Sequence, residues 1–157
     1  QLHVILWRIA AETRAHSADD LSGAGAAKAP GRWNEPGEPV VYTATSIALA
    51  VLETVAHLDD AGLPMNRFLV RIEVPDAIWQ RRESLDPAQL PPTWAAIPAG
   101  RSSTPIGSAW LRRGSSALLL VPSVIVPEER AVLINPQHPE ASSITAQCVR
   151  GFAYQRV

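Results

Sequence analysis

Cysteine is almost absent from this sequence of 157 residues, which contains a single one, Cys148. One thiol cannot form a disulfide within the chain, so the sequence argues against a disulfide-stapled secreted domain and favours a reducing cytoplasm. A zinc site built from several cysteines is excluded for the same reason. Cys148 has no histidine near it in the sequence, and we expect it to be a small core residue rather than a nucleophile.

Long hydrophobic runs and an excess of one charge are also missing. No stretch approaches the roughly 20 apolar residues of a membrane-spanning helix, and the first residues lack the features of a signal peptide. Lysine and arginine number 14 against 15 aspartates and glutamates. Nothing in this balance suggests a direct nucleic-acid binder or a membrane-surface binder. The sequence therefore predicts a cytoplasmic protein.

Motifs for metals and for redox cofactors are missing as well. The four histidines, at positions 3, 16, 57 and 138, do not have the spacing of metal ligands. The glycines of 22–25 lack the third glycine and the following helix of a dinucleotide-binding loop. We therefore expect neither a bound metal nor a prosthetic group.

Hydrophobic patterning predicts a mixture of strands and helices. Hydrophobic residues make up 46% of the chain and charged residues 18%, which is an ordinary globular composition. The expected elements do not alternate regularly, so we predict an α+β fold in a single compact domain over residues 1–157. Strands are expected at Leu2–Ile9, Val40–Thr43, Phe68–Val74, Ser116–Val121 and Arg130–Asn135, and helices at Ile47–Leu58 and from Thr104 to about Arg113.

Two segments look irregular, and the clearest helix lies between them. Residues 13–39 and 75–101 are rich in proline, and the first also in glycine and small residues. A loop as long as 13–39 is usually functional in a compact domain. The helix at Ile47–Leu58 is apolar on most sides and is expected to be buried, with Glu53 and His57 on one face. Its apolar stripe is Ala48, Val51, Leu52, Val55 and Leu58.

Three residue types in this region suggest a site for a phosphate-bearing ligand. Arg32 lies in the first long loop, and a guanidinium grips phosphate through two parallel hydrogen bonds without losing its charge. Tyr42 on the short strand can stack on a flat ring. Glu53 on the helix can stabilise a developing positive charge. Together they indicate a ligand with a phosphate, a flat base and a cationic transition state.

Each of these residues, taken alone, also has a structural interpretation. Arg32 can be a solvated loop charge, Tyr42 a core or edge aromatic, and Glu53 an ion-paired helix residue. An unpaired buried carboxylate is costly, so Glu53 needs a cationic partner. Arg32 and Arg8 are the candidates for that partner.

The ordered set of motifs resembles the RES-domain toxins, a family named for an arginine, a glutamate and a serine. Arg32, Glu53 and Ser123 match these three residues. The resemblance extends from Leu6 to about Pro139. It rests on Leu6–Ile9, Gly31–Asn34, Pro39–Ala44, Ser46–Ala50, Leu52–Glu53, Ser108–Leu111, Val121–Ser123 and Asn135–Pro139.

This resemblance implies a fold and a site. The implied fold is similar to bacterial ADP-ribosyltransferase toxins, with mixed sheets, a few helices and an NAD⁺ cleft. The implied chemistry consumes NAD⁺ as a substrate, and the implied partner is an antitoxin with an Xre-like helix-turn-helix region. The implied catalytic residues are Glu53, Arg32 and Ser123. The implied NAD⁺-binding residues are Arg8, Arg32, Tyr42, Ser123 and His57.

Three functions stay open at this point. In the first, the chain is a bacterial toxin that cleaves the nicotinamide–ribose bond of NAD⁺ by hydrolysis or phosphorolysis and so depletes NAD⁺. In the second, it transfers ADP-ribose from NAD⁺ to a cellular protein. In the third, it binds a nucleotide without turnover. The sequence does not choose between water, phosphate and protein as acceptor, because these differ only in what approaches one face of the ribose.

Overall fold

The protein combines strands and helices, which confirms the predicted α+β class. The computed structural model describes residues 2–55, 66–97 and 99–153. The strands are β1 (His3–Ala11), β2 (Val41–Ala44), β3 (Arg67–Pro75), β4 (Glu83–Ser84), β5 (Leu118–Pro122), β6 (Arg130–Ile134) and β7 (Thr145–Phe152). The helices are α1 (Ala24–Lys28), α2 (Ile47–Val55), α3 (Asp76–Gln80) and α4 (Thr104–Arg113), with 3₁₀ turns η1 (Pro87–Gln89), η2 (Pro92–Ala95) and η3 (Pro139–Ser143).

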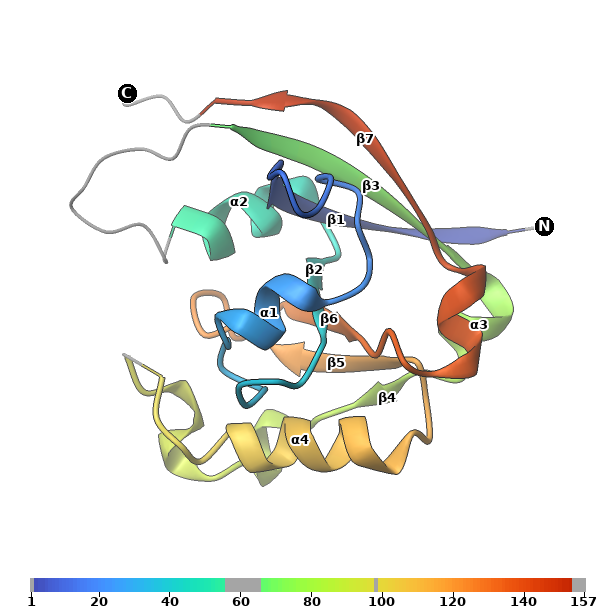
Figure 1. Ribbon diagram of the computed structural model, residues 1–157. Coiled ribbons are helices and arrows are strands. Elements are labelled where there is room, and N and C mark those ends of the chain that lie inside the picture. Colours follow the sequence, from blue (N-terminus) through green and yellow to red (C-terminus); the bar gives the residue numbers. More distant parts are fainter. Residues whose placement is uncertain (1, 56–65, 98, 154–157) are drawn as a thin grey trace.

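The described strands form one seven-stranded mixed sheet in the order β4-β5-β6-β2-β1-β3-β7. Only the β4–β5 pair is parallel among the described strands. β1 pairs with β3 along its whole length, whereas β1 and β2 share one register pair, Trp7 with Ala44. The sheet bends at this narrow junction, so that β1, β3 and β7 lie above β2, β6, β5 and β4 in Figure 1.

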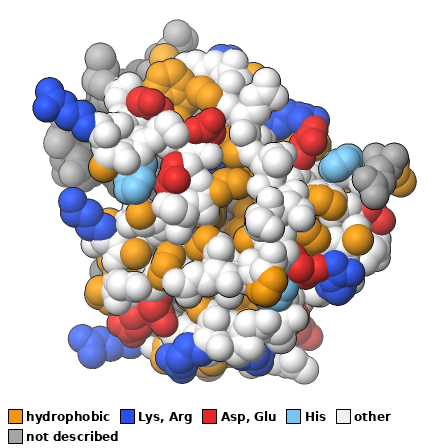
Figure 2. Space-filling view, turned by 45° about the vertical axis from the view of Figure 1, so that its right-hand side comes forward, with side chains coloured by type: hydrophobic (Ala, Val, Ile, Leu, Met, Phe, Trp, Pro, Cys, Tyr) orange, Lys and Arg blue, Asp and Glu red, His pale blue; other side chains and the backbone are white. Residues whose placement is uncertain are grey.

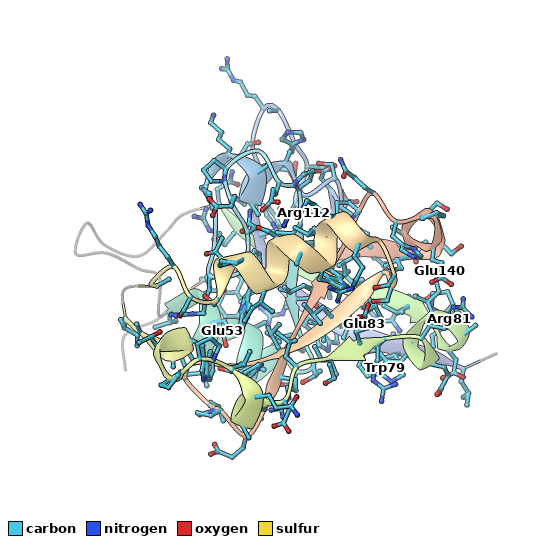
Figure 3. The ribbon with its side chains drawn as sticks, turned by 90° about the horizontal axis from the view of Figure 1, so that it is seen from below. Glu53, Trp79, Arg81, Glu83, Arg112 and Glu140 are labelled. Atoms are coloured by element: carbon cyan, nitrogen blue, oxygen red, sulfur yellow. The ribbon has the colours of Figure 1, made fainter. Side chains whose placement is uncertain are left out.

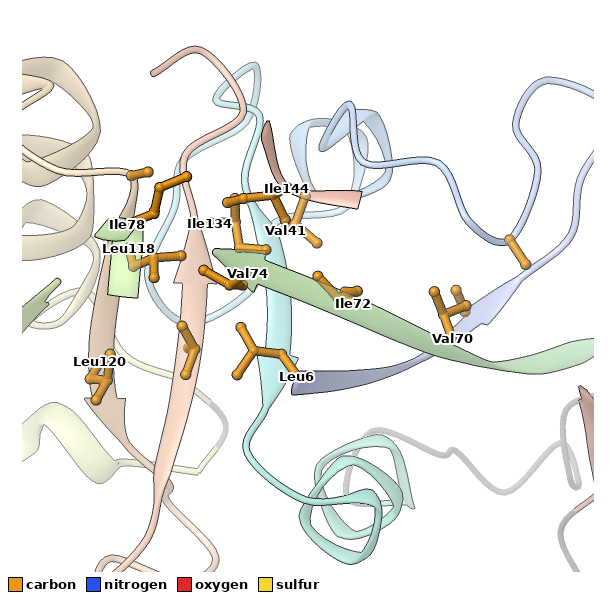
Figure 4. Close-up of a cluster of buried hydrophobic side chains, with 14 residues drawn as sticks. Leu6, Val41, Val70, Ile72, Val74, Ile78, Leu118, Leu120, Ile134 and Ile144 are labelled. Carbon is orange, nitrogen blue, oxygen red and sulfur yellow. The ribbon is translucent and has the colours of Figure 1, made fainter. Parts of the chain in front are cut away.

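The main hydrophobic core lies between these two halves of the sheet. Leu6 and Val70 from the upper half and Leu118 from the lower half are fully buried in it (Figure 4). Val70, Ile72 and Val74 alternate along β3 and are all buried, as the period-two pattern predicted. Burial of side chains from strands distant in sequence therefore fixes the bend of the sheet.

A second core lies under α4, on the opposite face of the lower half. Trp110 of α4 is fully buried, and its indole Nε1 donates to the hydroxyl of Ser116 at 3.1 Å. Trp33 stacks on Trp94 with ring centroids 6.2 Å apart. The helix ends at Gly114, whose left-handed conformation (φ 62°) matches the predicted stop.

α2 buries a different face from the predicted one. Leu49 and Ala50 are buried in a small cluster with β1, whereas Leu52 and Val55 of the predicted stripe are 44% and 43% exposed. When a helix is apolar on most sides, its sequence does not determine which face is buried. The sheet against which the helix packs determines that face. Leu58 lies outside the described residues.

The two segments expected to be irregular contain short elements. α1 lies within 13–39, and α3, β4, η1 and η2 lie within 75–101. Helices of five residues show too little of the 3.6-residue period to be recognised in a sequence. None of the helices in the described part of the chain has the length and apolar character that crossing a bilayer requires.

β7 forms one edge of the sheet, and Cys148 on it is exposed. The prediction of a core cysteine is therefore wrong. Among the described strands, β3 is the one partner of β7, and most β7 residues are exposed. Leu69 pairs with Arg150 and Val70 with Cys148, so Val149 is an extra residue in a β-bulge.

The surface carries both signs of charge. On the face shown in Figure 2, acidic and basic side chains are interspersed with hydrophobic ones. This distribution agrees with the formal net charge of −1.

Candidate active site

Arg32 lies between α1 and β2 and is held at its main chain and at its guanidinium. Its carbonyl accepts hydrogen bonds from Ser103 Oγ at 2.7 Å and Thr104 Oγ1 at 3.2 Å, where α4 begins. Its Nη1 donates to the carbonyls of Trp94 and Ala96, each at 2.8 Å. Nε and Nη2 make no hydrogen bond to any described residue, so they are available to a ligand.

Electrostatics place Arg32 close to Glu53 and Tyr42. Burial lowers the pKa of the Arg32 guanidinium, and the charges of Glu53 and then Tyr42 act in the opposite direction. Arginine stays protonated in proteins, so these two charges act on a permanent cation. Arg32 and Glu53 interact through space, although no direct ion pair joins them in the described structure. The structure therefore brings together the three residues that the sequence singled out.

Glu53 lies on α2 and is half-buried. Its Oε1 is buried and has no hydrogen-bond partner within the described residues. Buried polar atoms in native proteins are almost always paired, so an unpaired carboxylate oxygen calls for an explanation. In Figure 3, Glu53 lies on the other side of the view from Arg81 and Glu140. The cation whose charge interacts with Glu53 in the described structure is Arg32.

Arg8 lies on β1, two residues after Leu6 and two before Ala10, which are both buried in the main core. Its side chain leaves the strand on that same face. Nη1 lies 3.4 Å from the carbonyl oxygen of Tyr42, while Nε is buried and has no partner in the described part of the chain. Burial lowers the pKa of Arg8, and Asp20 opposes this shift. Arg8 therefore lies beside the main chain of Tyr42 on the main-core face of β1, whereas α2, which carries Glu53, packs against Trp7 and Ile9 on the other face.

Tyr42 on β2 is tied to the loop that carries Arg32. Its hydroxyl donates to Asn34 Oδ1 at 2.7 Å and accepts from the main-chain N–H of Trp33 at 3.1 Å. Its ring lies against Gly31, where an added Cβ would be 2.8 Å from the ring Cζ. Burial raises the pKa of Tyr42 well above its ordinary value. Tyr42 therefore supports the loop, and stacking on nicotinamide stays a separate prediction.

Ser123 follows β5 directly and is buried. Its hydroxyl accepts hydrogen bonds from the main-chain N–H groups of Ile125 and Val126, each at 3.1 Å. Val126 packs against the cluster that holds α2. Ser123 therefore shapes the turn beneath the helix that carries Glu53, and its hydroxyl is not hydrogen bonded to Glu53 itself.

His57 lies outside the described residues, so its predicted role stays a prediction. His138 is a turn residue, as its proline neighbours suggest, because its Nδ1 accepts from the main-chain N–H of Glu140 at 3.0 Å. In residues 2–55, 66–97 and 99–153, no three His, Cys, Asp or Glu side chains gather in a way that could hold a metal ion.

Sequence reasoning missed the groups that hold Arg32 in place. Asn34 was part of a matched motif, but no role was assigned to its side chain, which is 2% exposed. The carbonyls of Trp94 and Ala96 leave no trace in a sequence, because every residue has one. Ser103 and Thr104 stand at the start of the expected helix, and their hydroxyls bind the carbonyl of Arg32. A serine–threonine pair before a proline was the only available signal.

A cavity of about 390 Å³ lies beside α4, away from these residues. Its lining is mostly apolar, and none of the site residues contributes to it. The candidate site therefore rests on the hydrogen bonds and charges around Arg32 and Glu53. The cavity is lined by Leu85, Pro105, Ile106, Ala109, Trp110, Arg113 and Leu119.

Comparison with known sequences points to one family. The RES domain model matches residues 5–156. The chain is 57% identical over 148 residues to a Sphingobium sp. (strain YBL2) protein named Prs ADP-ribosylating toxin, covering 94% of this chain and 92% of that protein. It is 42% identical over 149 residues to a Pseudomonas putida (strain KT2440) protein named Toxin Res, covering 92% of each.

A solved structure shares the fold. The structure of the M. tuberculosis MbcT–MbcA toxin–antitoxin complex contains a chain that matches with a TM-score of 0.63 at 19% sequence identity. The match covers 96% of this chain and 86% of that one. This likeness confirms the fold alone. The family model and the sequence relatives, which span nearly the whole chain, show that this protein belongs to the RES domain family.

Proposed function

We propose that this chain is the toxin of a bacterial toxin–antitoxin pair and that it breaks the nicotinamide–ribose bond of NAD⁺. The observation that carries the proposal is the buried, unpartnered Oε1 of Glu53 within electrostatic range of Arg32. The names of the Sphingobium and Pseudomonas relatives support a toxin. The MbcT–MbcA complex supports an antitoxin partner, which we propose to be of the Xre-like helix-turn-helix type.

The chemistry of NAD⁺ fits these residues. Nicotinamide leaves as a neutral ring, so its departure needs no general acid, and positive charge develops on the ribose as in glycoside cleavage. An ionised Glu53 beside the ribose stabilises this charge, and its free oxygen can accept a hydrogen bond from a ribose hydroxyl. The unbonded Nε and Nη2 of Arg32 are suited to the pyrophosphate. Because Nη1 is already bound to two carbonyls, the guanidinium is oriented before the substrate arrives.

A protein is the favoured acceptor for the ADP-ribose group. The support is the name of the Sphingobium relative, an ADP-ribosylating toxin that is 57% identical to this chain. Water and phosphate use the same first step, because all three acceptors need the nicotinamide–ribose bond to break. The surface around the ribose therefore decides which acceptor is used, whereas Glu53 and Arg32 act in the cleavage step that all three acceptors share.

One experiment tests the reaction and its acceptor together. The purified chain is incubated with NAD⁺ labelled in its adenylate half, with and without phosphate, and with a bacterial lysate. Free ADP-ribose, ADP-ribose 1″-phosphate and a labelled protein band identify water, phosphate and protein as acceptors, respectively. If a folded chain leaves NAD⁺ unchanged under every condition, the proposal is overturned in favour of a nucleotide-binding module.

Replacing Arg32 by lysine tests its role in substrate capture. Lysine keeps the charge but cannot hold two carbonyls and a pyrophosphate at once, because it lacks the planar fork. We expect the KM for NAD⁺ to rise about 10-fold, equivalent to about 1.4 kcal/mol, with a smaller change in kcat. Initial rates over a range of NAD⁺ concentrations measure both constants.

Arg112→Lys is the matched control, because Arg112 is exposed on α4 (Figure 3) and no described residue accepts a hydrogen bond from it. It should leave both constants at their wild-type values. An Arg32→Lys protein with wild-type KM and kcat would remove Arg32 from the site.

A further inference from the structure

Asn34 lies two residues after Arg32, and the acceptor atom of its side chain joins two parts of the site. Oδ1 accepts a hydrogen bond from the main-chain N–H of Gly31 at 2.9 Å and from the hydroxyl of Tyr42 at 2.7 Å. The same hydroxyl accepts from the main-chain N–H of Trp33 at 3.1 Å. The main chain on either side of Arg32 is therefore held by one pair, Asn34 and Tyr42.

The donor atom of the same side chain fixes this pair to the rest of the loop. Nδ2 donates to the carbonyls of Ala26 at 2.9 Å, Glu38 at 3.0 Å and Glu35 at 3.3 Å. Ala26 belongs to α1, and Glu38 is bound in turn by the hydroxyl of Ser108 on α4 at 2.6 Å. Asn34 itself is 2% exposed. A satisfied polar network that is buried to this degree specifies one arrangement of its members.

We propose that Asn34 is a positioning residue, which sets the main chain of Arg32 and the ring of Tyr42 at a fixed distance from each other for NAD⁺ binding. The inference rests on the proposed function. In this proposal, the side-chain amide of Asn34 holds the loop in its conformation without contacting the substrate. An apolar side chain at position 34 would leave the partly buried Tyr42 hydroxyl, the Gly31 N–H and three main-chain carbonyls without their present partner.

The physical consequence is a selective effect on binding. Without the Asn34 side chain, the main-chain N–H of Gly31 loses its partner, and the Tyr42 hydroxyl that accepts from Trp33 loses its own acceptor, so the main chain on both sides of Arg32 is held less firmly. The bonds from Arg32 Nη1 to the carbonyls of Trp94 and Ala96 persist. Arg32 then stays in the region but has to be ordered by the substrate, which weakens capture more than it slows the chemical step.

The test compares Asn34→Ala with Asn135→Ala. Asn135 is equally buried at 2% exposure, and its side chain donates to the carbonyl of Leu111 and accepts from the N–H of Gln137, outside the Arg32 loop. Asn34→Ala should raise the KM for NAD⁺ about 10-fold, the change expected for one lost hydrogen bond, with a smaller change in kcat. Asn135→Ala should lower thermal stability to a similar degree and leave the KM unchanged.

A double-mutant cycle adds a readout that a merely structural role would not move. Tyr42→Phe removes the same hydrogen bond from the other side, so its effect on KM should be much smaller in the Asn34→Ala background than in the wild type. Additive effects would overturn the proposal. If Asn34→Ala does not fold, Tyr42→Phe alone decides, and an unchanged KM in that variant also overturns it.

Failure of this inference is distinguishable from failure of the proposed function. NAD⁺ consumption by the wild-type chain is measured first, and its absence defeats the proposed function together with the role of Asn34. A wild-type chain that consumes NAD⁺, beside a folded Asn34→Ala protein with unchanged KM, defeats the positioning role alone.

Discussion

Replacing Glu53 by glutamine is expected to lower the rate of NAD⁺ consumption at saturating substrate by at least about 100-fold, the usual effect of removing one group that stabilises transition-state charge. Glutamine keeps the shape of the side chain and removes its charge. Positive charge on the ribose develops only as the nicotinamide bond breaks, so the loss should appear in kcat more than in KM. Steady-state rates measured over a range of NAD⁺ concentrations separate the two.

Stability provides an independent check on this variant. Oε1 of Glu53 is buried without a partner in the described structure, and a charge in such a place destabilises the fold. Removing that charge should leave the melting temperature equal to that of the wild type or raise it. An inactive variant of unchanged or higher stability would therefore show that activity is lost through chemistry and not through unfolding.

Glu83→Gln is the matched control for Glu53→Gln. Glu83 is also a half-buried carboxylate, but it accepts hydrogen bonds from Arg113 and Ser115 and lies far from Glu53 in Figure 3. Its replacement should lower stability and leave kcat unchanged. Near-normal turnover in Glu53→Gln would reject the role assigned to Glu53.

Replacing Gly107 by alanine is expected to destabilise the fold by about 3 kcal/mol, near the upper end for overpacking a close contact. In an exposed helix the same change stabilises by about 1 kcal/mol, because alanine is the better helix former. Here an added Cβ would lie 1.9 Å from the carbonyl oxygen of Trp33 and 2.8 Å from its carbonyl carbon. Main-chain atoms cannot relieve the clash by rotating as a side chain can, so α4 and the main chain at Trp33 must move apart.

This variant should also weaken NAD⁺ capture, because Trp33 follows Arg32 directly in the chain. Denaturant unfolding measures the loss of stability, and the KM for NAD⁺ reports the displacement of Arg32. Gly25→Ala in α1 is the matched control, since an added Cβ there meets nothing within 4 Å. It should be neutral or stabilising. Equal stability of Gly107→Ala and the wild type would contradict the close approach of α4.

The parts of the fold that depend on local patterning follow from the sequence. The alternation along β3 and the glycine after α4 predict a strand and a helix end, and both are present. The sequence does not predict which face of α2 is buried or that Cys148 is exposed, because both depend on which strands lie beside α2 and β7. A sequence pattern shows that a surface is apolar, and only the assembled sheet decides what covers it.

The candidate site divides along the same line. Arg32, Tyr42 and Glu53 are recognisable from residue type and order, and the structure brings them together through the loop, β2 and α2. The groups that hold Arg32 are not recognisable, since two are main-chain carbonyls more than sixty positions further along the chain. Asn34 belongs to one of the matched motifs, but its residue type does not indicate which main-chain groups its amide binds.

Both arginines predicted to bind NAD⁺ are oriented by peptide oxygens: Arg32 by those of residues 94 and 96, and Arg8 by that of residue 42. A peptide oxygen survives almost every amino-acid replacement at its position. Position 96, whose side chain is exposed, can therefore drift freely during evolution while its oxygen keeps the same task. Among relatives, a variable residue there would conceal an invariant contact, and ranking positions by their sequence conservation alone would overlook it.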